Sequence, residues 1–313
     1  MKFEDIKNVS VIGAGLMGHG IAQEFATKGY KVRMNDLSED YLTKAIENIK
    51  RNLIMMTKAG LMAEEDAVKA IDNISTSTSL ESVAIDADLV IEAVYENLEL
   101  KKRIFRKLDD NCPEHSILAS NSSSLMPSHM ARSTQRPEKV LVTHYFNPPH
   151  LLPLVEIVRG EFTSEDTVQC VYDLYTSMGK TPAVVQKEVP GFIGNRLQTA
   201  LIREALSLVE NGVASPRDVD VVVKNGFGRR LSAAGPFEIF DIAGWDLTLA
   251  VSKYLLPHIE SSKEVPKILE EKVRAGELGV KSGKGFYEYS DESADALRSR
   301  IAQALIRIAS WEK

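Results

Sequence analysis

The stretch Val9-Ser-Val-Ile-Gly-Ala-Gly-Leu-Met-Gly-His-Gly-Ile-Ala22 decides the fold of this chain. It opens with an apolar run over residues 9–12 that is typical of a buried strand, and from residue 16 onward its apolar residues recur at helical spacing. Between the two, residues 13–18 fit the pattern Gly-x-Gly-x-x-Gly, which is informative when it joins a strand to a helix. The sequence therefore predicts a phosphate-binding turn at the start of a Rossmann-type sheet.

Each glycine of this turn has an expected task. Gly13 permits the tight turn, Gly15 lets the backbone approach a pyrophosphate, and Gly18 allows close packing of helix on strand. The N-terminus of the following helix offers free N–H groups and the positive end of its dipole to the phosphates. We therefore expect a dinucleotide cofactor to contact Gly13, Gly15, Leu16, Met17 and Gly18.

The next β-rich run, residues 31–36, ends in an acid, Asp36, which lies 23 residues after Gly13. A carboxylate at this place accepts hydrogen bonds from the hydroxyls of the adenosine ribose and repels a 2′-phosphate. Arg33 lies too early in the run to compensate for that repulsion. The sequence therefore predicts NAD rather than NADP as the cofactor.

The first 186 residues alternate β-rich runs with helical stretches, which predicts a mainly parallel sheet with helices on both faces. The expected strands are residues 9–13, 31–36, 87–92, 116–120, 140–144, 154–158 and 183–186, and the expected helices are 16–28, 39–58, 97–110 and 164–178. After Pro190-Gly191 only helices are expected, over residues 192–211, 216–225, 236–256, 265–275 and 294–309. We therefore predict an α/β, Rossmann-type NAD-binding domain over residues 1–187 and an all-helical domain for substrate binding and dimerisation over 188–313.

Composition agrees with two ordinary globular domains in a chain of 313 residues with 44% hydrophobic and 26% charged residues. The net charge of −6 gives no general attraction to nucleic acid or an anionic membrane. Cys112 and Cys170 form no framework for disulfides or zinc, so no metal is expected. The start of the chain carries two acids and resembles no signal peptide, and no run is long enough to span a membrane, so we expect a soluble, cytoplasmic protein.

The densest chemistry lies in Thr143-His-Tyr-Phe-Asn-Pro-Pro-His-Leu-Leu-Pro-Leu-Val-Glu156. His144 ends one expected strand and Glu156 lies on the next, so the proline-rich loop between them can bring the two side chains together. Histidine is the natural base for an alcohol that loses a hydride, because its unperturbed pKa of about 6.5 lies near working pH. A carboxylate on the other ring nitrogen fixes the tautomer and stabilises the imidazolium. We expect His150, which has no such companion, to be a loop residue.

Three further features have two interpretations each. The serines that follow the strand over 116–120 can reach a substrate or the nicotinamide, but serine clusters are also ordinary turns before helices. Asn195 can hold a substrate carbonyl or be a surface residue. Glu96 and Lys101 follow the strand over 87–92 near the cofactor crevice, but they can equally be a solvated pair on a helix.

These motifs together resemble the L-3-hydroxyacyl-CoA dehydrogenase family up to about residue 290. The matching stretches are residues 13–22, 92–97, 119–125, 144–147 through 156, 190–196, 235–241 and 281–287. The resemblance implies an oxidoreductase of fatty acid metabolism, with His144 as general base and Glu156 as its orienting partner. It implies further that Ser123 and Asn195 hydrogen-bond the reacting oxygens of the substrate. It also implies that Asp36, Glu96 and Lys101 contact NAD, that Asn147 supports the loop after His144 on the cofactor side, and that the helical domain forms a homodimer.

Two departures from the CoA-active members concern the substrate and the C-terminus. Leu152-Pro153 stands where those members usually carry Met-Lys, and the stretch 147–153 resembles relatives that act on free acids, such as L-gulonate 3-dehydrogenase (lambda-crystallin), carnitine dehydrogenase and a pyridine-carboxylate dehydrogenase. The basic residues available for CoA phosphates, Lys50, Arg51 and Lys58, are few. Beyond residue 289 an apolar stripe (Leu297, Ile301, Leu305, Ile308, Trp311) predicts an extra helix at a dimer interface.

The leading hypothesis is an NAD-dependent dehydrogenase that interconverts a short L-3-hydroxyacyl-CoA, such as 3-hydroxybutyryl-CoA, and its 3-oxo product. The same chemistry on a free 3-hydroxy carboxylic acid is a close second. The third hypothesis, an inactive NAD-binding structural protein, predicts the loss of His144, Glu156 or a glycine of the turn, and all of these are present.

Overall fold

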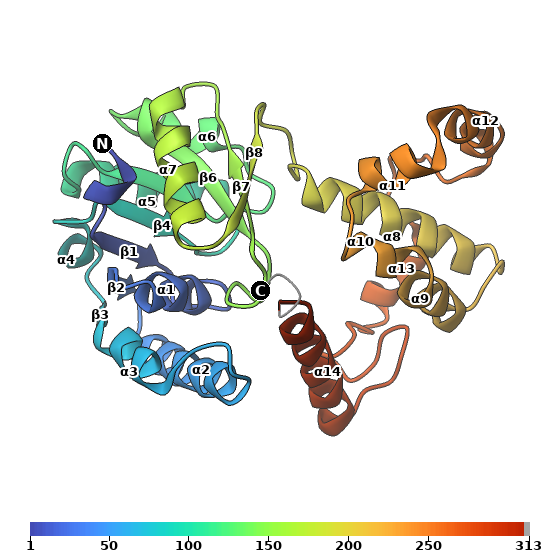
Figure 1. The fold of residues 1–313 in the computed structure, drawn as a ribbon, viewed down its shortest axis with the longest axis horizontal. Helices are drawn as coiled ribbons and strands as arrows, with labels where there is room; N and C mark the ends of the chain where they lie inside the picture. Colours follow the sequence, from blue (N-terminus) through green and yellow to red (C-terminus); the bar gives the residue numbers. More distant parts are fainter. Residues whose placement is uncertain (310–313) are drawn as a thin grey trace. The chain divides into compact units, whose positions relative to one another are not determined.

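An eight-stranded sheet lies at the centre of residues 1–195 in the computed structural model, which describes residues 1–309 (Figure 1). The strand order is β3-β2-β1-β4-β5-β6-β7-β8, and every neighbouring pair is parallel except β6 and β7. The strands are β1 (Asn8–Ile12), β2 (Lys31–Asn35), β3 (Ile74–Ser77), β4 (Leu89–Glu92), β5 (Ile117–Ser120), β6 (Val140–Tyr145), β7 (Leu154–Val158) and β8 (Thr181–Val185). This arrangement confirms the predicted Rossmann-type, mainly parallel sheet.

Helices cover both faces of this sheet, as a parallel sheet requires. They are α1 (Gly18–Thr27), α2 (Glu39–Lys58), α3 (Glu64–Asp72), α4 (Leu80–Ala84), α5 (Leu98–Asn111), α6 (Pro127–Ala131) and α7 (Glu165–Ser177), with short 3-10 turns at Phe3–Asp5 and Pro137–Lys139. Apolar side chains of α1, α2, α3 and α7 form one core with the sheet, and those of α4, α5 and α6 form the other. Strands β4, β5 and β6 are buried along their whole length between these two cores.

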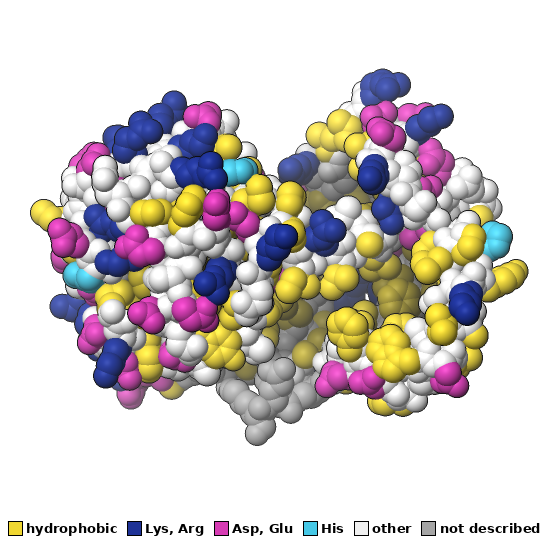
Figure 2. All heavy atoms as spheres, turned by 90° about the horizontal axis from the view of Figure 1, so that it is seen from above, with side chains coloured by type: hydrophobic (Ala, Val, Ile, Leu, Met, Phe, Trp, Pro, Cys, Tyr) yellow, Lys and Arg dark blue, Asp and Glu magenta, His cyan; other side chains and the backbone are white. Residues whose placement is uncertain are grey.

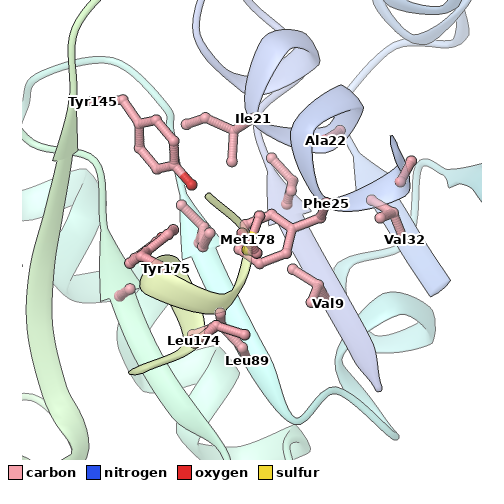
Figure 3. Packing of buried hydrophobic residues seen from close by; sticks show 14 of the residues in the cluster. Val9, Ile21, Ala22, Phe25, Val32, Leu89, Tyr145, Leu174, Tyr175 and Met178 are labelled. Carbon is pink, nitrogen blue, oxygen red and sulfur yellow. The ribbon is translucent and has the colours of Figure 1, made fainter. Parts of the chain in front are cut away.

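Figure 3 shows the first of these cores, in which Phe25 of α1 packs against Tyr175 of α7 with ring centroids 6.0 Å apart. Tyr145, the last residue of β6, meets the same Tyr175 edge to face at 5.6 Å. The residue after His144 is thereby fixed in the core, so the end of β6 is a rigid platform for the histidine.

The chain from Arg196 onward forms a second, helical unit, with α8 (Gly194–Glu210) leading into it. Its other helices are α9 (Pro216–Asn225), α10 (Phe227–Leu231), α11 (Pro236–Ala243), α12 (Trp245–Leu255), a 3-10 turn at Leu256–His258, α13 (Lys267–Arg274) and α14 (Asp291–Ala309). Among residues 196–308 of this unit, only Leu206 and Ala294 are buried. Within residues 1–309, no helix is both long and apolar enough to cross a membrane.

The predicted elements are largely confirmed, with corrections at short segments. The sequence prediction missed β3, α3, α4, α6 and α10. It also joined α11 and α12 into one helix over residues 236–256, but Gly244, with a φ of 94°, ends α11 and starts α12. The predicted tail helix is present as α14, and Trp311 of its stripe lies outside the described residues.

Candidate active site

The candidate site lies at the carboxyl edge of the sheet, where the strand order reverses between β1 and β4. The chain leaves β1 toward β2 on one side, whereas β4 lies on the other side of β1, which creates a crevice of the kind that binds ligands in such folds. At this point the backbones approach closely, because Ala93 N donates to Ile12 O at 2.7 Å. The turn after β1 is therefore fixed against the end of β4.

The glycine turn has the geometry expected of a phosphate-binding loop. Gly13 has a φ of +101°, and a Cβ on Gly18 would lie 1.7 Å from Gly13 O, so neither position accepts a larger residue without rearrangement. A Cβ on Gly15 would meet nothing within 4 Å, and Gly15 and Leu16 are exposed. The turn is thus tightly built where it meets the protein and open where a pyrophosphate would approach, which fits a dinucleotide.

Asp36 follows β2 and bonds the glycine turn directly. Its Oδ2 accepts from Ala14 N at 2.7 Å, and its Oδ1 accepts from Leu37 N at 2.7 Å. Arg33, the nearby base, is paired with Asp86. The carboxylate is therefore held beside the turn, as the expected contact with the adenosine ribose needs, while Arg33 is engaged elsewhere.

His144 and Glu156 are direct partners in the antiparallel register of β6 and β7. Because opposed residues of such a pair project to the same face, the two side chains meet, and His144 Nδ1 lies 2.7 Å from Glu156 Oε2. Both residues are buried, with 3% and 1% of their surfaces exposed. A carboxylate accepts, so Nδ1 carries the proton and Nε2 presents its lone pair.

Glu156 is held ionised by more than the histidine. Its Oε1 accepts backbone N–H bonds from Ile193 at 3.0 Å and Gly194 at 2.9 Å, at the start of α8. Burial raises the pKa of Glu156, but the hydrogen bonds from His144, Gly194 and Ile193 outweigh it and leave that pKa below the ordinary 4.5. The bond to the histidine follows from the sequence pattern, whereas the two backbone bonds were not predicted.

Two aromatic rings enclose the histidine. Phe146 lies 4.7 Å and Phe192 5.7 Å from the ring of His144, measured between centroids. Phe146 also requires a glycine at position 194, because a Cβ there would lie 2.3 Å from Phe146 Cζ. The pair therefore sits among apolar rings, where a charge-assisted hydrogen bond is strong.

The serine loop, defined here as residues 121–124, follows β5 and contacts two other predicted site residues, Glu96 and Asn195. Ser123 is exposed, its backbone N–H donates to Glu96 Oε1 at 3.1 Å, and its carbonyl accepts from Asn195 Nδ2 at 2.9 Å. Lys101 is buried beneath Glu96, with its Nζ 3.4 Å from Glu96 Oε2. Asn147 is exposed in the loop after β6.

A mainly parallel sheet with a glycine turn and an acid directly after β2 is typical of a dinucleotide-binding protein. Comparison with known proteins agrees: the family described as "3-hydroxyacyl-CoA dehydrogenase, NAD binding domain" matches residues 8–189, and its "C-terminal domain" matches residues 191–289. The chain belongs to the 3-hydroxyacyl-CoA dehydrogenase family. It is accordingly an NAD-dependent oxidoreductase that acts on a CH–OH group.

Its relatives include enzymes of both substrate types. The chain is 40% identical over 291 residues to a probable 3-hydroxybutyryl-CoA dehydrogenase of Bacillus subtilis, covering 93% of this chain and all of the relative. It is 34% identical over 306 residues to 5-formyl-3-hydroxy-2-methylpyridine 4-carboxylate 5-dehydrogenase of Mesorhizobium japonicum, covering 97% of each. A solved structure of a 5-formyl-3-hydroxy-2-methylpyridine 4-carboxylic acid 5-dehydrogenase has a TM-score of 0.91 and 33% sequence identity to this chain, and the match covers 97% of each chain. The structure of (S)-3-hydroxybutyryl-CoA dehydrogenase from Ralstonia eutropha has a TM-score of 0.76 and 36% identity, and the match covers 91% of this chain and all of that one.

Proposed function

We propose that this chain interconverts an L-3-hydroxyacyl-CoA of short chain length and the corresponding 3-oxoacyl-CoA, with His144 as the general base. The observation that carries the role of His144 is its buried hydrogen bond from Nδ1 to Glu156 Oε2, at 2.7 Å, on two directly opposed strand residues. The 40% identity to a probable 3-hydroxybutyryl-CoA dehydrogenase supports the CoA ester as substrate. The hydrogen bond leaves Nε2 free to take the proton of a substrate hydroxyl, and the carboxylate stabilises the imidazolium that results.

The remaining predicted residues are proposed to bind and orient the substrate and NAD. The Ser123 hydroxyl and the Asn195 amide are proposed to hydrogen-bond the reacting oxygens of the substrate, and the bond between Asn195 Nδ2 and Ser123 O keeps these two groups adjacent. The residues of the glycine turn (Gly13, Gly15, Leu16, Met17, Gly18) hold the pyrophosphate of NAD, and Asp36 holds its adenosine ribose. When bound, NAD supplies the acceptor for the hydride that leaves C3 of the substrate. Glu96 and Asn147 are proposed to line the same cofactor site.

A free 3-hydroxy carboxylic acid is the second candidate substrate. The likeness to the pyridine-carboxylate dehydrogenase covers 97% of this chain, compared with 93% for the CoA-named relative of Bacillus subtilis. Leu152-Pro153 in the loop after His144 and the few basic residues on α2 point the same way, because the phosphates of CoA need basic partners.

One assay separates the two candidates and tests the chemistry. NADH oxidation is followed with acetoacetyl-CoA and, in parallel, with a panel of free 3-oxo acids at matched concentrations. The proposal expects the higher kcat/KM with acetoacetyl-CoA. A preference of more than tenfold for a free acid transfers the proposal to the second candidate, and no turnover of any 3-oxo compound contradicts both.

We also propose that the C-terminal unit pairs with a second copy of this chain. Among its residues 196–308, only Leu206 and Ala294 are buried, whereas Phe237 is 75% and Ile242 is 88% exposed. Apolar side chains cover much of the visible face of this unit in Figure 2. A helical unit needs an apolar core to be stable, and a subunit interface that resembles half of such a core provides it in obligate dimers.

The dimer has a direct test. One chain has a mass of 34.6 kDa, and light scattering after size-exclusion chromatography is expected to give twice that mass. Ile242→Asp is expected to produce a monomer with a lower Tm, whereas Ile85→Asp, at a position 68% exposed in the N-terminal unit, is expected to leave the dimer intact. A wild-type monomer at micromolar concentration contradicts the proposal.

A further inference from the structure

A buried ion pair lies directly beneath the serine loop. Glu92, the last residue of β4, and Lys101 of α5 have 0% and 1% of their surfaces exposed. Lys101 Nζ lies 2.7 Å from Glu92 Oε1 and 2.9 Å from Oε2. Burial of two charges is costly unless their hydrogen bonds are satisfied, so such a pair needs further partners.

Those partners connect the pair to the serine loop. Glu92 Oε2 accepts from Ser120 Oγ at 2.6 Å, and Ser120 Oγ in turn accepts from the backbone N–H of Ser122 at 3.1 Å. The backbone carbonyl of Glu92 accepts from Asn121 N at 2.7 Å. A single residue, Glu92, thereby fixes the first half of the loop through both its side chain and its backbone.

Glu96 fixes the second half. Its Oε1 accepts from Ser122 Oγ at 2.5 Å, from the backbone N–H of Ser123 at 3.1 Å, and from Ser124 through its N–H at 3.0 Å and its hydroxyl at 2.9 Å. Its Oε2 faces Lys101 at 3.4 Å. The ammonium group therefore lies between two carboxylates, and each carboxylate holds one half of the loop.

We infer that Glu92 and Lys101 are positioning residues, which act through the serine loop to present the Ser123 hydroxyl to the substrate. This inference rests on the proposed role of Ser123. The Lys101 Nζ also lies 3.4 Å from the carbonyl oxygen of Val94, so its place beneath the loop is fixed from several sides. The serine loop also contacts the strand that carries His144, because Asn121 Oδ1 accepts from Tyr145 N at 2.9 Å and Tyr145 follows His144 in β6.

The first test uses Ser120→Ala, which removes the hydroxyl between Glu92 and Ser122 and leaves the ion pair whole. A loss of roughly 10- to 100-fold in kcat is expected, because small misplacement of a substrate-binding group costs that much. Tm is expected to fall by a few degrees, because Glu92 Oε2 loses a donor and the Ser122 N–H loses its acceptor in a buried place. The Kd of NADH, measured by fluorescence without substrate, is expected to stay near the wild-type value. The substrate in this test is the 3-oxo compound that the wild type reduces best. If the wild type reduces none, the proposed function has failed before the variant is made, so the two failures are distinguished.

The second test uses Lys101→Met alone and together with Glu92→Gln. The single variant leaves a buried carboxylate unpaired and is expected to lower Tm strongly, and the double variant is expected to recover part of the Tm but not the kcat. Lys102→Met is the matched control, because this neighbour on α5 pairs with the exposed Glu99 at 2.8 Å. Its kcat and Tm are expected to be unchanged.

Two results overturn the inference. A Kd for NADH weakened more than tenfold in the double variant, with wild-type kcat at saturating NADH, makes Lys101 a cofactor ligand. Wild-type kcat and kcat/KM in Ser120→Ala mean that the network supports the fold alone.

Discussion

Replacement of Glu156 by glutamine tests the proposed base with almost no change in shape. In the wild type, Oε1 accepts from two backbone N–H groups and Oε2 accepts from His144 Nδ1. A glutamine has one oxygen and one NH₂ group, and the two N–H groups of Ile193 and Gly194 require the oxygen. The NH₂ group then faces Nδ1, so the imidazole proton moves to Nε2, and the atom proposed to take the substrate proton is blocked.

The size of the effect follows from what is lost. A positioned general base contributes about 10²- to 10⁴-fold, which corresponds to about 3–5 kcal/mol in the activation barrier. Folding is affected less, because all three hydrogen bonds persist. Each changes from a bond to a charged group into a neutral one, but the buried charge and its desolvation cost are also removed, so the net cost is about 1 kcal/mol. We therefore expect kcat to fall at least 100-fold while Tm changes by a few degrees.

The assay is steady-state NADH oxidation with the preferred 3-oxo substrate, accompanied by thermal unfolding and NADH binding. Glu161→Gln is the matched control: this glutamate pairs with Arg132 at 2.9 Å and its side chain is 58% exposed, so no change is expected. A Glu156→Gln enzyme with a kcat within threefold of the wild type, folded and with normal NADH affinity, would refute the proposed orientation of the base.

Three further changes test other parts of the site and the fold. His144→Gln is expected to keep NADH affinity and lose at least roughly 100-fold in kcat, and near-normal turnover would remove His144 from the mechanism. Asp36→Ala is expected to relax the preference for NAD over NADP, and an unchanged ratio of the two kcat/KM values would show that the carboxylate is not at the ribose. Burial, with His19 and Lys180 nearby, lowers the pKa of His150 from 6.5 to about 4. Between pH 6.5 and 4 the unfolded chain therefore binds a proton that the folded chain does not, so the free energy of unfolding decreases as the pH is lowered from 6.5 to 4. His150→Gln is expected to make this decrease smaller when unfolding by urea is measured at several pH values. An equally steep decrease in the variant would contradict the prediction.

Much of the fold could be predicted because hydrophobic periodicity marks long elements. The limits of α2 and α9 agree with those predicted because a serine cap begins each helix, Ser38 before α2 and Ser215 before α9. Short elements were not predicted because their conformation depends on pairing and packing with other elements, which leaves no periodic pattern in their own sequence. Strand β3, Ile-Ser-Thr-Ser, has one apolar residue and is a strand only because β2 pairs with it.

The candidate site could be predicted in part for a similar reason. The glycine turn and the pairing of His144 with Glu156 follow from motif and strand spacing, and the geometry of both is present. Glu92 was overlooked, although a charge at the end of the apolar run Leu89-Val-Ile is a signal, because a buried carboxylate needs a partner. No sequence pattern identifies Lys101 as that partner, since the pairing depends on how α5 lies against the sheet.

Glu156 links the proposed base to the end of the N-terminal unit, residues 192–194. The same carboxylate that orients His144 also accepts from the backbone N–H groups of Ile193, which precedes α8, and of Gly194, its first residue. Phe192, with a φ of 52° and 1% exposure, packs on the histidine ring at this point. A change that displaces residues 192–194 would therefore remove two donors from Glu156 and alter its hydrogen bond to the base, so substitutions at the start of α8 are expected to act on kcat through Glu156 even where they touch no substrate.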